Sequence, residues 1–285
     1  MTIALDAGVD TSVQRPQGGT SAILDWLPRL VFAAYMVLFF IYLFLPLVVM
    51  TAATFNASKF PTVTPWLGTT LGWFSALWAD QAMWQALRLS VFIGLCVIVI
   101  ALPVGTAAAL FLTSLQGKAR TFLYAVMVSP LLTPGVAIGI STLILWRQAG
   151  IGGGALLIIL AQASFISAYV MLMVAARLQR FDRTLEEAAL GLGASRFMVF
   201  RRILLPYLRP SLLAAMLIAF LQSFENYNTT LFVRGTETPL TVYVATKVRT
   251  GLTPAVNALG LILIVLTIAA AIAVELGKRR RAQAR

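Results

Sequence analysis

The sequence contains no histidine and only one cysteine, Cys96, which lies inside an apolar run. A single cysteine cannot form a disulfide within the chain, and zinc sites are built mainly from several Cys and His side chains. We therefore expect no metal site and take Cys96 to be a small packing residue. The chain also lacks a Gly-x-x-x-x-Gly-Lys-Ser/Thr phosphate loop, because its nearest segment, GKAR at Gly117, has neither that glycine spacing nor the Ser/Thr.

Charged residues are also scarce. They make up 11% of the 285 residues, against 60% hydrophobic residues and a mean hydropathy of +0.89, whereas soluble domains carry about 25% charged residues. The chain is expected to be an all-α integral membrane protein, because its apolar runs are long enough for helices and do not alternate like barrel strands. Hydropathy predicts six spans, over Leu30–Ala53, Trp84–Leu115, Thr121–Trp146, Gly154–Ala175, Leu208–Phe232 and Asn257–Leu276.

The basic residues predict the orientation of these spans. With the N-terminus inside, 16 of the 22 Lys and Arg residues fall in cytoplasmic segments, as the positive-inside rule requires. The expected organisation is a cytoplasmic tail over 1–28, a transmembrane domain over 29–276 and a basic cytoplasmic tail over 277–285. This placement accounts for the net charge of +12 without a nucleic-acid partner, and the final tail, KRRRAQAR, is expected to contact lipid headgroups.

A polar segment interrupts the apolar pattern between the fourth and fifth spans. Residues 183–190 are predicted to form a short helix whose packed side includes Leu185, Ala188 and Ala189, with Glu186 and Glu187 near its positive end. The glycines that follow permit a sharp break. Ser195 is then expected to cap a second short helix over 196–202.

This segment resembles the EAA loop of ABC-importer permeases. The match is Glu187-Ala188-Ala189, three residues, Gly193, nine residues, Ile203, one residue, and Leu205-Pro206. The resemblance implies a type I importer permease fold, in which residues 176–206 form a cytoplasmic coupling loop that docks in a cleft of an ATPase. Coupling is then expected to depend on Glu186, Glu187, Ala188, Ala189, Gly193, Ile203, Leu205 and Pro206.

Other stretches resemble the second permease subunit of the spermidine/putrescine branch of this family. They are FNASKF, SPLLTPG, SFENYNTTLFVRG and TPAVNALG. The resemblance implies a bacterial inner-membrane importer in which this chain works with a second permease of different sequence, two ABC ATPases and a periplasmic substrate-binding protein. This chain is expected to bind no cofactor, because ATP and Mg²⁺ would be held by the ATPase subunits.

The expected substrate pathway centres on Glu225, since ionisable groups within a membrane are costly and usually functional. Gln222, Asn226, Tyr227 and Asn228 surround it in the sequence, and a carboxylate beside amides and an aromatic ring suits a cation. The alternative is that these groups satisfy one another at an interface or a re-entrant bend. Pro134 and Gly135 predict a kinked, thin third span beside a cavity or gate, although helix packing would also explain the glycine.

The sequence thus predicts a non-enzymatic permease for a polyamine or a similar cationic solute. An importer of the same type for an opine, an amino-acid derivative, thiamine or ferric iron remains an alternative. A secondary transporter that works without ATP is a second alternative, which leaves the EAA spacing unexplained. A membrane enzyme lacks a catalytic group of His, Cys or paired carboxylates.

Overall fold

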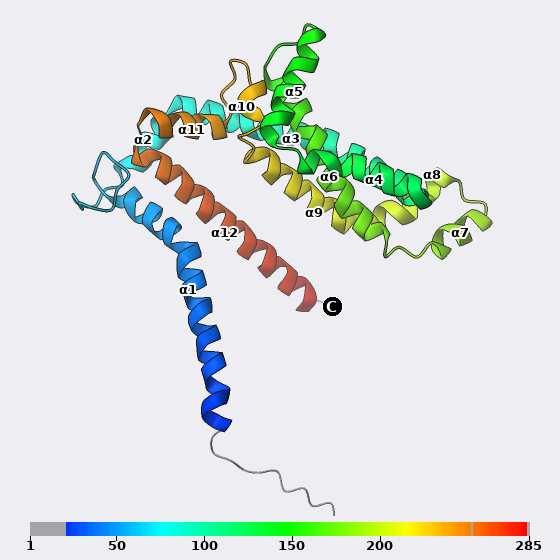
Figure 1. Ribbon diagram of the computed structural model, residues 1–285, viewed down its shortest axis with the longest axis horizontal. Helices are drawn as coiled ribbons and strands as arrows, with labels where there is room; N and C mark the ends of the chain where they lie inside the picture. The colour runs from blue at the N-terminus through cyan, green and yellow to red at the C-terminus, as the bar shows by residue number, and fades with distance from the viewer. Residues whose placement is uncertain (1–20, 252, 284–285) are drawn as a thin grey trace, which may run out of the picture.

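The computed structural model describes residues 21–251 and 253–283, which form helices joined by loops (Figure 1). Within these ranges the only β pairing is an isolated bridge between Asn56 and Thr69, so the predicted all-α fold is confirmed. Most of the predicted N-terminal tail and the last two residues lie outside the described residues.

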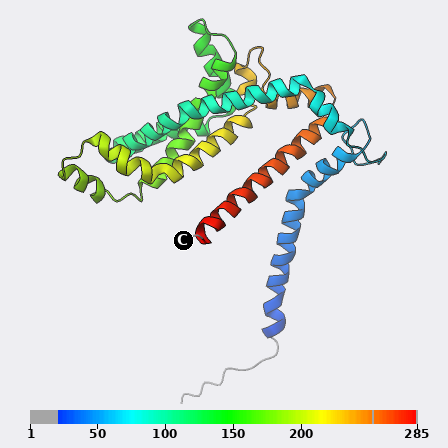
Figure 2. The same ribbon diagram turned by 180° about the vertical axis from the view of Figure 1, so that it is seen from behind.

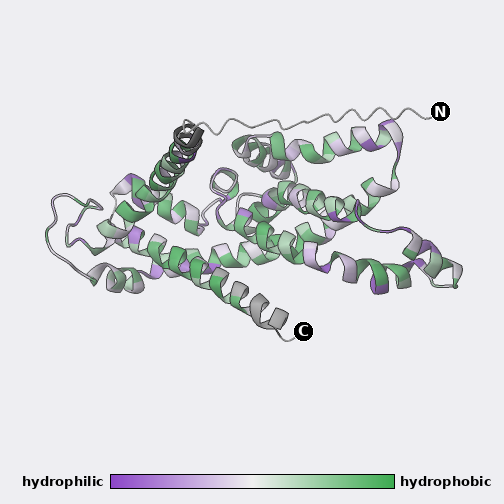
Figure 3. Ribbon diagram, turned by 90° about the horizontal axis from the view of Figure 1, so that it is seen from below, coloured by the Kyte–Doolittle hydropathy of each residue, from purple (hydrophilic) through white to green (hydrophobic). Residues whose placement is uncertain are grey.

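The core is a bundle of three long helices: α3 (Gln81–Ser114), α6 (Ala155–Leu178) and α9 (Leu205–Phe224). Figure 1 shows them side by side, and Figure 3 shows their largely hydrophobic colouring. Small residues allow the close packing, since a Cβ at Gly105 of α3 would lie 2.5 Å from the Ser167 carbonyl oxygen of α6.

Two further long helices extend away from this bundle in both ribbon views (Figures 1 and 2). They are α1 (Ser21–Phe55) and α12 (Pro254–Gln283), which contact each other. Gly260 of α12 faces the Met50 side chain of α1, where a Cβ would approach the sulfur to 3.1 Å. Most described apolar side chains of α1 are exposed, as expected for a helix that faces lipid or other subunits.

Four described helical segments are long and apolar enough to cross a membrane: Pro28–Phe55, Gln81–Ser114, Ala155–Leu178 and Arg196–Phe224. A fifth arises if α4 (Gly117–Leu132) and α5 (Gly135–Gln148) form one broken span. The apolar part of α12 among the described residues covers Pro254–Ala269. The six-span count and its orientation therefore stay predictions.

The third predicted span is broken rather than kinked. The sequence predicted one bent helix over 121–146, but α4 and α5 meet at 101°. Thr133 has extended backbone angles, and proline disfavours the helical conformation in the residue that precedes it. Pro134 also has no N–H to continue the helix.

The prediction for the fifth span was wrong at both ends. It was expected over 208–232, but the helix begins with α8 (Arg196–Val199), continues through the π-helix η1 (Phe200–Leu204) into α9, and ends at Phe224. The second helix of the coupling loop is therefore not separate from the span. The π-helix ends two residues before Pro206, whose missing N–H prevents regular hydrogen bonding to the preceding turn.

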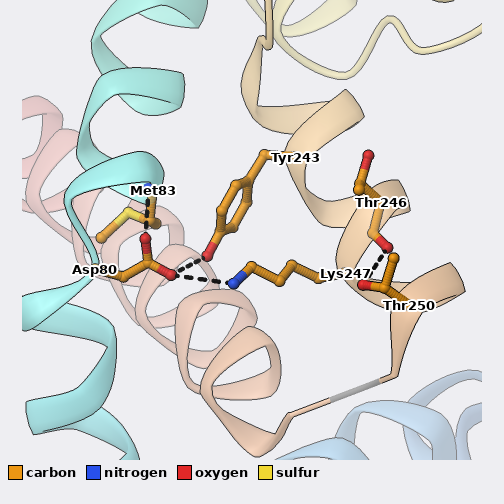
Figure 4. Close-up of polar contacts among 6 residues, drawn as sticks. All are labelled: Asp80, Met83, Tyr243, Thr246, Lys247 and Thr250. Carbon is orange, nitrogen blue, oxygen red and sulfur yellow. Dashed lines mark hydrogen bonds and ion pairs between the residues drawn. The ribbon is translucent and has the colours of Figure 1, made fainter.

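The end of the molecule opposite the coupling loop carries two helices that hydropathy did not predict: α2 (Gly72–Ala79) and α11 (Leu240–Thr250). Figure 4 shows how α11 is attached. The Tyr243 hydroxyl donates a 2.6 Å hydrogen bond to Asp80, which also accepts the Met83 N–H and pairs with Lys247 at 3.4 Å. Asp80 thus caps α3 and anchors α11.

Candidate functional site

A polar pocket of about 360 Å³ lies where α4, α5, α6 and the end of α9 meet. It gathers most of the predicted pathway residues, which come from α5, α9 and the loop that follows α9: Gly135, Gln222, Glu225, Asn226, Tyr227 and Asn228. Pro134 is not among the lining residues and instead precedes the first residue of α5. Phe165 and Tyr169 add aromatic walls from α6.

The pocket wall at residues 225–229 is a non-helical link between α9 and α10 (Thr230–Val233). Asn226 explains why the helix does not continue. Its Oδ1 accepts hydrogen bonds from the backbone N–H groups of Thr229 and Thr230, at 3.2 and 3.4 Å. Asparagine side chains compete with helical hydrogen bonding in this way, so Asn226 shapes the pocket.

Glu225 gives the pocket its negative charge. Its side chain is exposed, and no described residue forms an ion pair with it. Glu225 and Tyr227 also line a second, mostly apolar pocket of about 540 Å³, bounded by α11 and α12. The carboxylate therefore stands between two cavities. Among the described residues, no cluster of three Asp, Glu or Cys side chains could hold a metal ion.

The glycines of α5 allow this helix to approach the pocket loop. A Cβ at Gly135 would lie 3.0 Å from the Thr229 hydroxyl, and one at Gly139 would lie 2.7 Å from the Thr229 carbonyl oxygen. Both glycines therefore admit close packing of α5 against the loop, and Gly135 lines the pocket as well, so the two explanations open from sequence both stay open. Thr229 is buried, and its hydroxyl has no partner among the described residues.

Three polar residues that were not singled out from the sequence are bonded to one another next to the 225–229 loop: Gln162, Ser223 and Thr230. Gln162 of α6 is 2% exposed and hydrogen-bonds to Ser223 and Thr230. The sequence signal that could have revealed this cluster was a glutamine within an otherwise apolar span, because a buried amide requires hydrogen-bond partners.

The predicted coupling loop (176–206) contains α7 (Thr184–Gly191), which lies at the end of the bundle away from α2 and α11 (Figure 1). Gly193 follows it at φ +84°, with hydrogen bonds from the Ala194 N–H to Ala189 and from the Gly193 N–H to Leu190. This is a Schellman ending, in which glycine takes the left-handed position. The predicted break at Gly193 and the predicted cap at Ser195, which accepts the Met198 N–H, are both present.

The predicted packed side of α7 is not covered by this chain. None of its residues is buried, and Leu185 is 53% exposed. Exposed apolar side chains continue after the helix, with Leu192 at 90% and Phe197 at 70%. Glu187 and Ala188 are also exposed. The apolar positions of α7 face outward, which is typical of a surface that contacts another protein.

Arg183 attaches α7 to the bundle by donating a 2.8 Å hydrogen bond to the Thr113 carbonyl at the end of α3. Within the bundle, Arg177 at the end of α6 stacks over the Tyr207 ring of α9 at 4.2 Å, and the Tyr207 hydroxyl donates back to the Arg177 carbonyl. The exposed surface of α7 is therefore linked directly to α3, which packs against α6 and α9.

A family model described as "Binding-protein-dependent transport system inner membrane component" matches residues 101–283. The chain belongs to this family. As a member, it is a multi-pass membrane subunit of a binding-protein-dependent transport system, which confirms the resemblance to importer permeases.

Similar proteins of this transport family include two from Escherichia coli strain K12. The putrescine transport system permease protein PotI is 36% identical over 237 residues, covering 80% of this chain and 84% of PotI. The spermidine/putrescine transport system permease protein PotC is 30% identical over 251 residues, covering 87% of this chain and 94% of PotC.

Solved structures support the same permease fold. A chain of a bacterial ABC transporter involved in import of the acidic polysaccharide alginate superposes with a TM-score of 0.68 at 16% identity, covering 92% of this chain and 99% of that one. A chain of the MetNI methionine ABC transporter has a TM-score of 0.52 at 19% identity, covering 71% and 94%. The fold is thus shared by transporters of very different solutes.

Proposed function

We propose that this chain is one permease subunit of an ATP-driven bacterial importer for a polyamine. The similarity to PotI and PotC supports the substrate class. The observation that carries the proposal is the pocket at Glu225, where a carboxylate that forms no ion pair with any described residue lines the same cavity as Tyr169 and Tyr227. A carboxylate and aromatic faces both attract an ammonium group.

The remaining subunits follow from the coupling loop. We assign the loop to the cytoplasmic side, with both termini inside, and assign α2 and α11 to the periplasmic side. Two ATPase subunits that hold ATP and Mg²⁺ contact the exposed surface around Glu187. A second permease completes the pathway, and a periplasmic binding protein delivers the substrate. Closure of the ATPases moves α7 and, through Arg183, the bundle.

Uptake by the assembled complex in proteoliposomes tests the substrate class. With labelled putrescine and a loaded binding protein, the wild type should import only with ATP. Glu225→Gln should raise the half-saturating concentration about tenfold, because one ionic contact of about 1.4 kcal/mol is lost. An importer of a neutral or anionic solute would be indifferent to this change.

The ATP-independent alternative is tested with the same substrate. Vesicles that contain this chain alone and carry an ion gradient should show no uptake. Gradient-driven uptake under those conditions would support a secondary transporter and contradict the proposed function.

A further inference from the structure

Gln162 is a polar side chain buried in the first half of α6, one helical turn from the buried apolar residues Ile158 and Ile166. Burying an amide in such a place is unfavourable unless its polar atoms are hydrogen-bonded. Both ends of this amide have partners, and the partners lie on two other helical elements. Its position therefore connects segments that are distant in sequence.

The hydrogen bonds have a defined direction. The Ser223 hydroxyl donates to Gln162 Oε1 at 2.5 Å, and Gln162 Nε2 donates to the Thr230 hydroxyl at 2.8 Å. The Thr230 hydroxyl can then donate to Asn226 Oδ1, which lies 3.5 Å away and also accepts the Thr229 N–H. We call Ser223, Gln162, Thr230 and Asn226 the buried relay.

The relay holds both ends of the pocket wall. Ser223 lies in the last turn of α9, and Thr230 is the first residue of α10. The segment between them carries Glu225 and the other loop residues that line the pocket. One side chain of α6 therefore fixes the entry and the exit of the loop that presents the carboxylate.

We infer that Gln162 is a positioning residue that holds the 225–229 loop against the pocket and thereby sets the affinity of the pathway for its substrate. The role of Gln162 in holding the loop does not depend on which substrate is carried. Its effect on affinity rests on the proposed function. A role in folding alone would lower the amount of protein without changing substrate affinity in the protein that does assemble.

Thr230 offers a matched pair of variants. Thr230→Val removes the hydroxyl at nearly constant shape, whereas Thr230→Ser keeps the hydroxyl and thus the relay. Gln162→Leu removes the central amide. Ser164→Ala is a control on the same helix, because the Ser164 hydroxyl donates only within α6, to the Ala161 carbonyl.

The first measurement is the labelling rate of the loop in the assembled complex. Cys96 is the only native cysteine, so Cys96→Ala with Thr229→Cys gives one reporter thiol in this chain, at a position of the pocket wall that is only 1% exposed. Gln162→Leu and Thr230→Val should each speed its reaction with a membrane-impermeant maleimide about tenfold, because the loop opens more often. Thr230→Ser and Ser164→Ala should leave the rate unchanged.

The second measurement is transport without the reporter cysteine. Gln162→Leu and Thr230→Val should raise the half-saturating putrescine concentration about tenfold, with little change in maximal rate or in ATP used per putrescine, as expected for lost binding. Unchanged labelling rates in both variants would overturn the inference, and Thr230→Val decides the matter if Gln162→Leu fails to assemble. If labelling changes but the wild-type complex imports no putrescine, the positioning role stands and the proposed substrate fails.

Discussion

The Arg183 guanidinium donates a 2.8 Å hydrogen bond to the Thr113 backbone carbonyl, so the start of α7 is tied to the last turn of α3. Terminal carbonyls of a helix have no partner within the helix, and arginine is well suited to satisfy them. α3 in turn packs along α6 and α9 in the core. A displacement of α7 can therefore be passed directly to the bundle.

This contact predicts that Arg183→Ala weakens coupling without preventing assembly. Uptake per ATP hydrolysed should fall about threefold to tenfold, in line with the loss of one charge-assisted hydrogen bond. Arg180→Ala is the control, since Arg180 is an exposed arginine of the same loop. Equal coupling ratios for both variants would show that the Arg183 contact transmits nothing.

Glu187 is predicted to be needed for attachment of the ATPase. Its exposed carboxylate lies in the first turn of α7, beside uncovered apolar side chains. Glu187→Lys reverses the charge at this surface, and co-purification of the ATPase subunits should fall at least tenfold while membrane insertion stays normal. Normal co-purification and transport would contradict the assignment of this surface.

The two glycines at the end of α7 differ in backbone conformation but have similar open space around them. Gly193 has φ +84° and open space around it, whereas Gly191 is helical and equally open. Gly193→Val should therefore cost about 1–2 kcal/mol locally through backbone strain and reduce coupled uptake. Gly191→Ala should not reduce it. Uptake per ATP hydrolysed is the measurement, and equal effects of the two substitutions would argue against a role for the turn.

Close packing between α3 and α6 predicts a strong effect at Gly105. An added Cβ would meet the Ser167 carbonyl and Val170, and overpacking of this kind costs about 1–3 kcal/mol. Gly105→Ala should lower the thermal unfolding temperature in detergent. Gly277→Ala is the control, because that helical glycine has no neighbour in the way, and it should be neutral or stabilising.

The attachment of α11 predicts a dependence of stability on pH. Burial alone would raise the pKa of Asp80, but the Tyr243 hydroxyl, the Met83 N–H and the Lys247 charge together hold it below its ordinary value of 3.8. A lowered pKa stabilises the folded state above the ordinary value, and this contribution is lost as the pH falls below it. Unfolding temperature measured from pH 7 downward should show an acid loss that Asp80→Asn reduces.

The sequence was a good guide to the membrane class, the family and the turn of the coupling loop. Apolar runs, Gly193 and Ser195 each determine local structure directly, so their signals did not depend on the rest of the fold. The loop at Glu225 was recognised as polar and was found to line a pocket.

The features that the sequence did not predict depend on contacts between residues far apart in the chain. At the end of α9, Ser223 is bonded to Gln162 of α6, which is 61 positions away, and hydropathy continued the span through Phe232 because Leu231 and Phe232 are apolar. The anchoring of α11 to Asp80 joins residues 163 positions apart. The apolar pattern of α7 did not by itself show whether this chain or another protein covers it, because a docking surface has the same pattern as a packed one.

The most direct test of the account is putrescine uptake by proteoliposomes that contain this chain, its partner permease and two ATPases, with the binding protein outside and ATP inside. The account predicts uptake that requires both the binding protein and ATP, that falls with Glu187→Lys, and that needs more putrescine for half-saturation with Glu225→Gln. Uptake that continues without ATP, or that is unaffected by both substitutions, would contradict it.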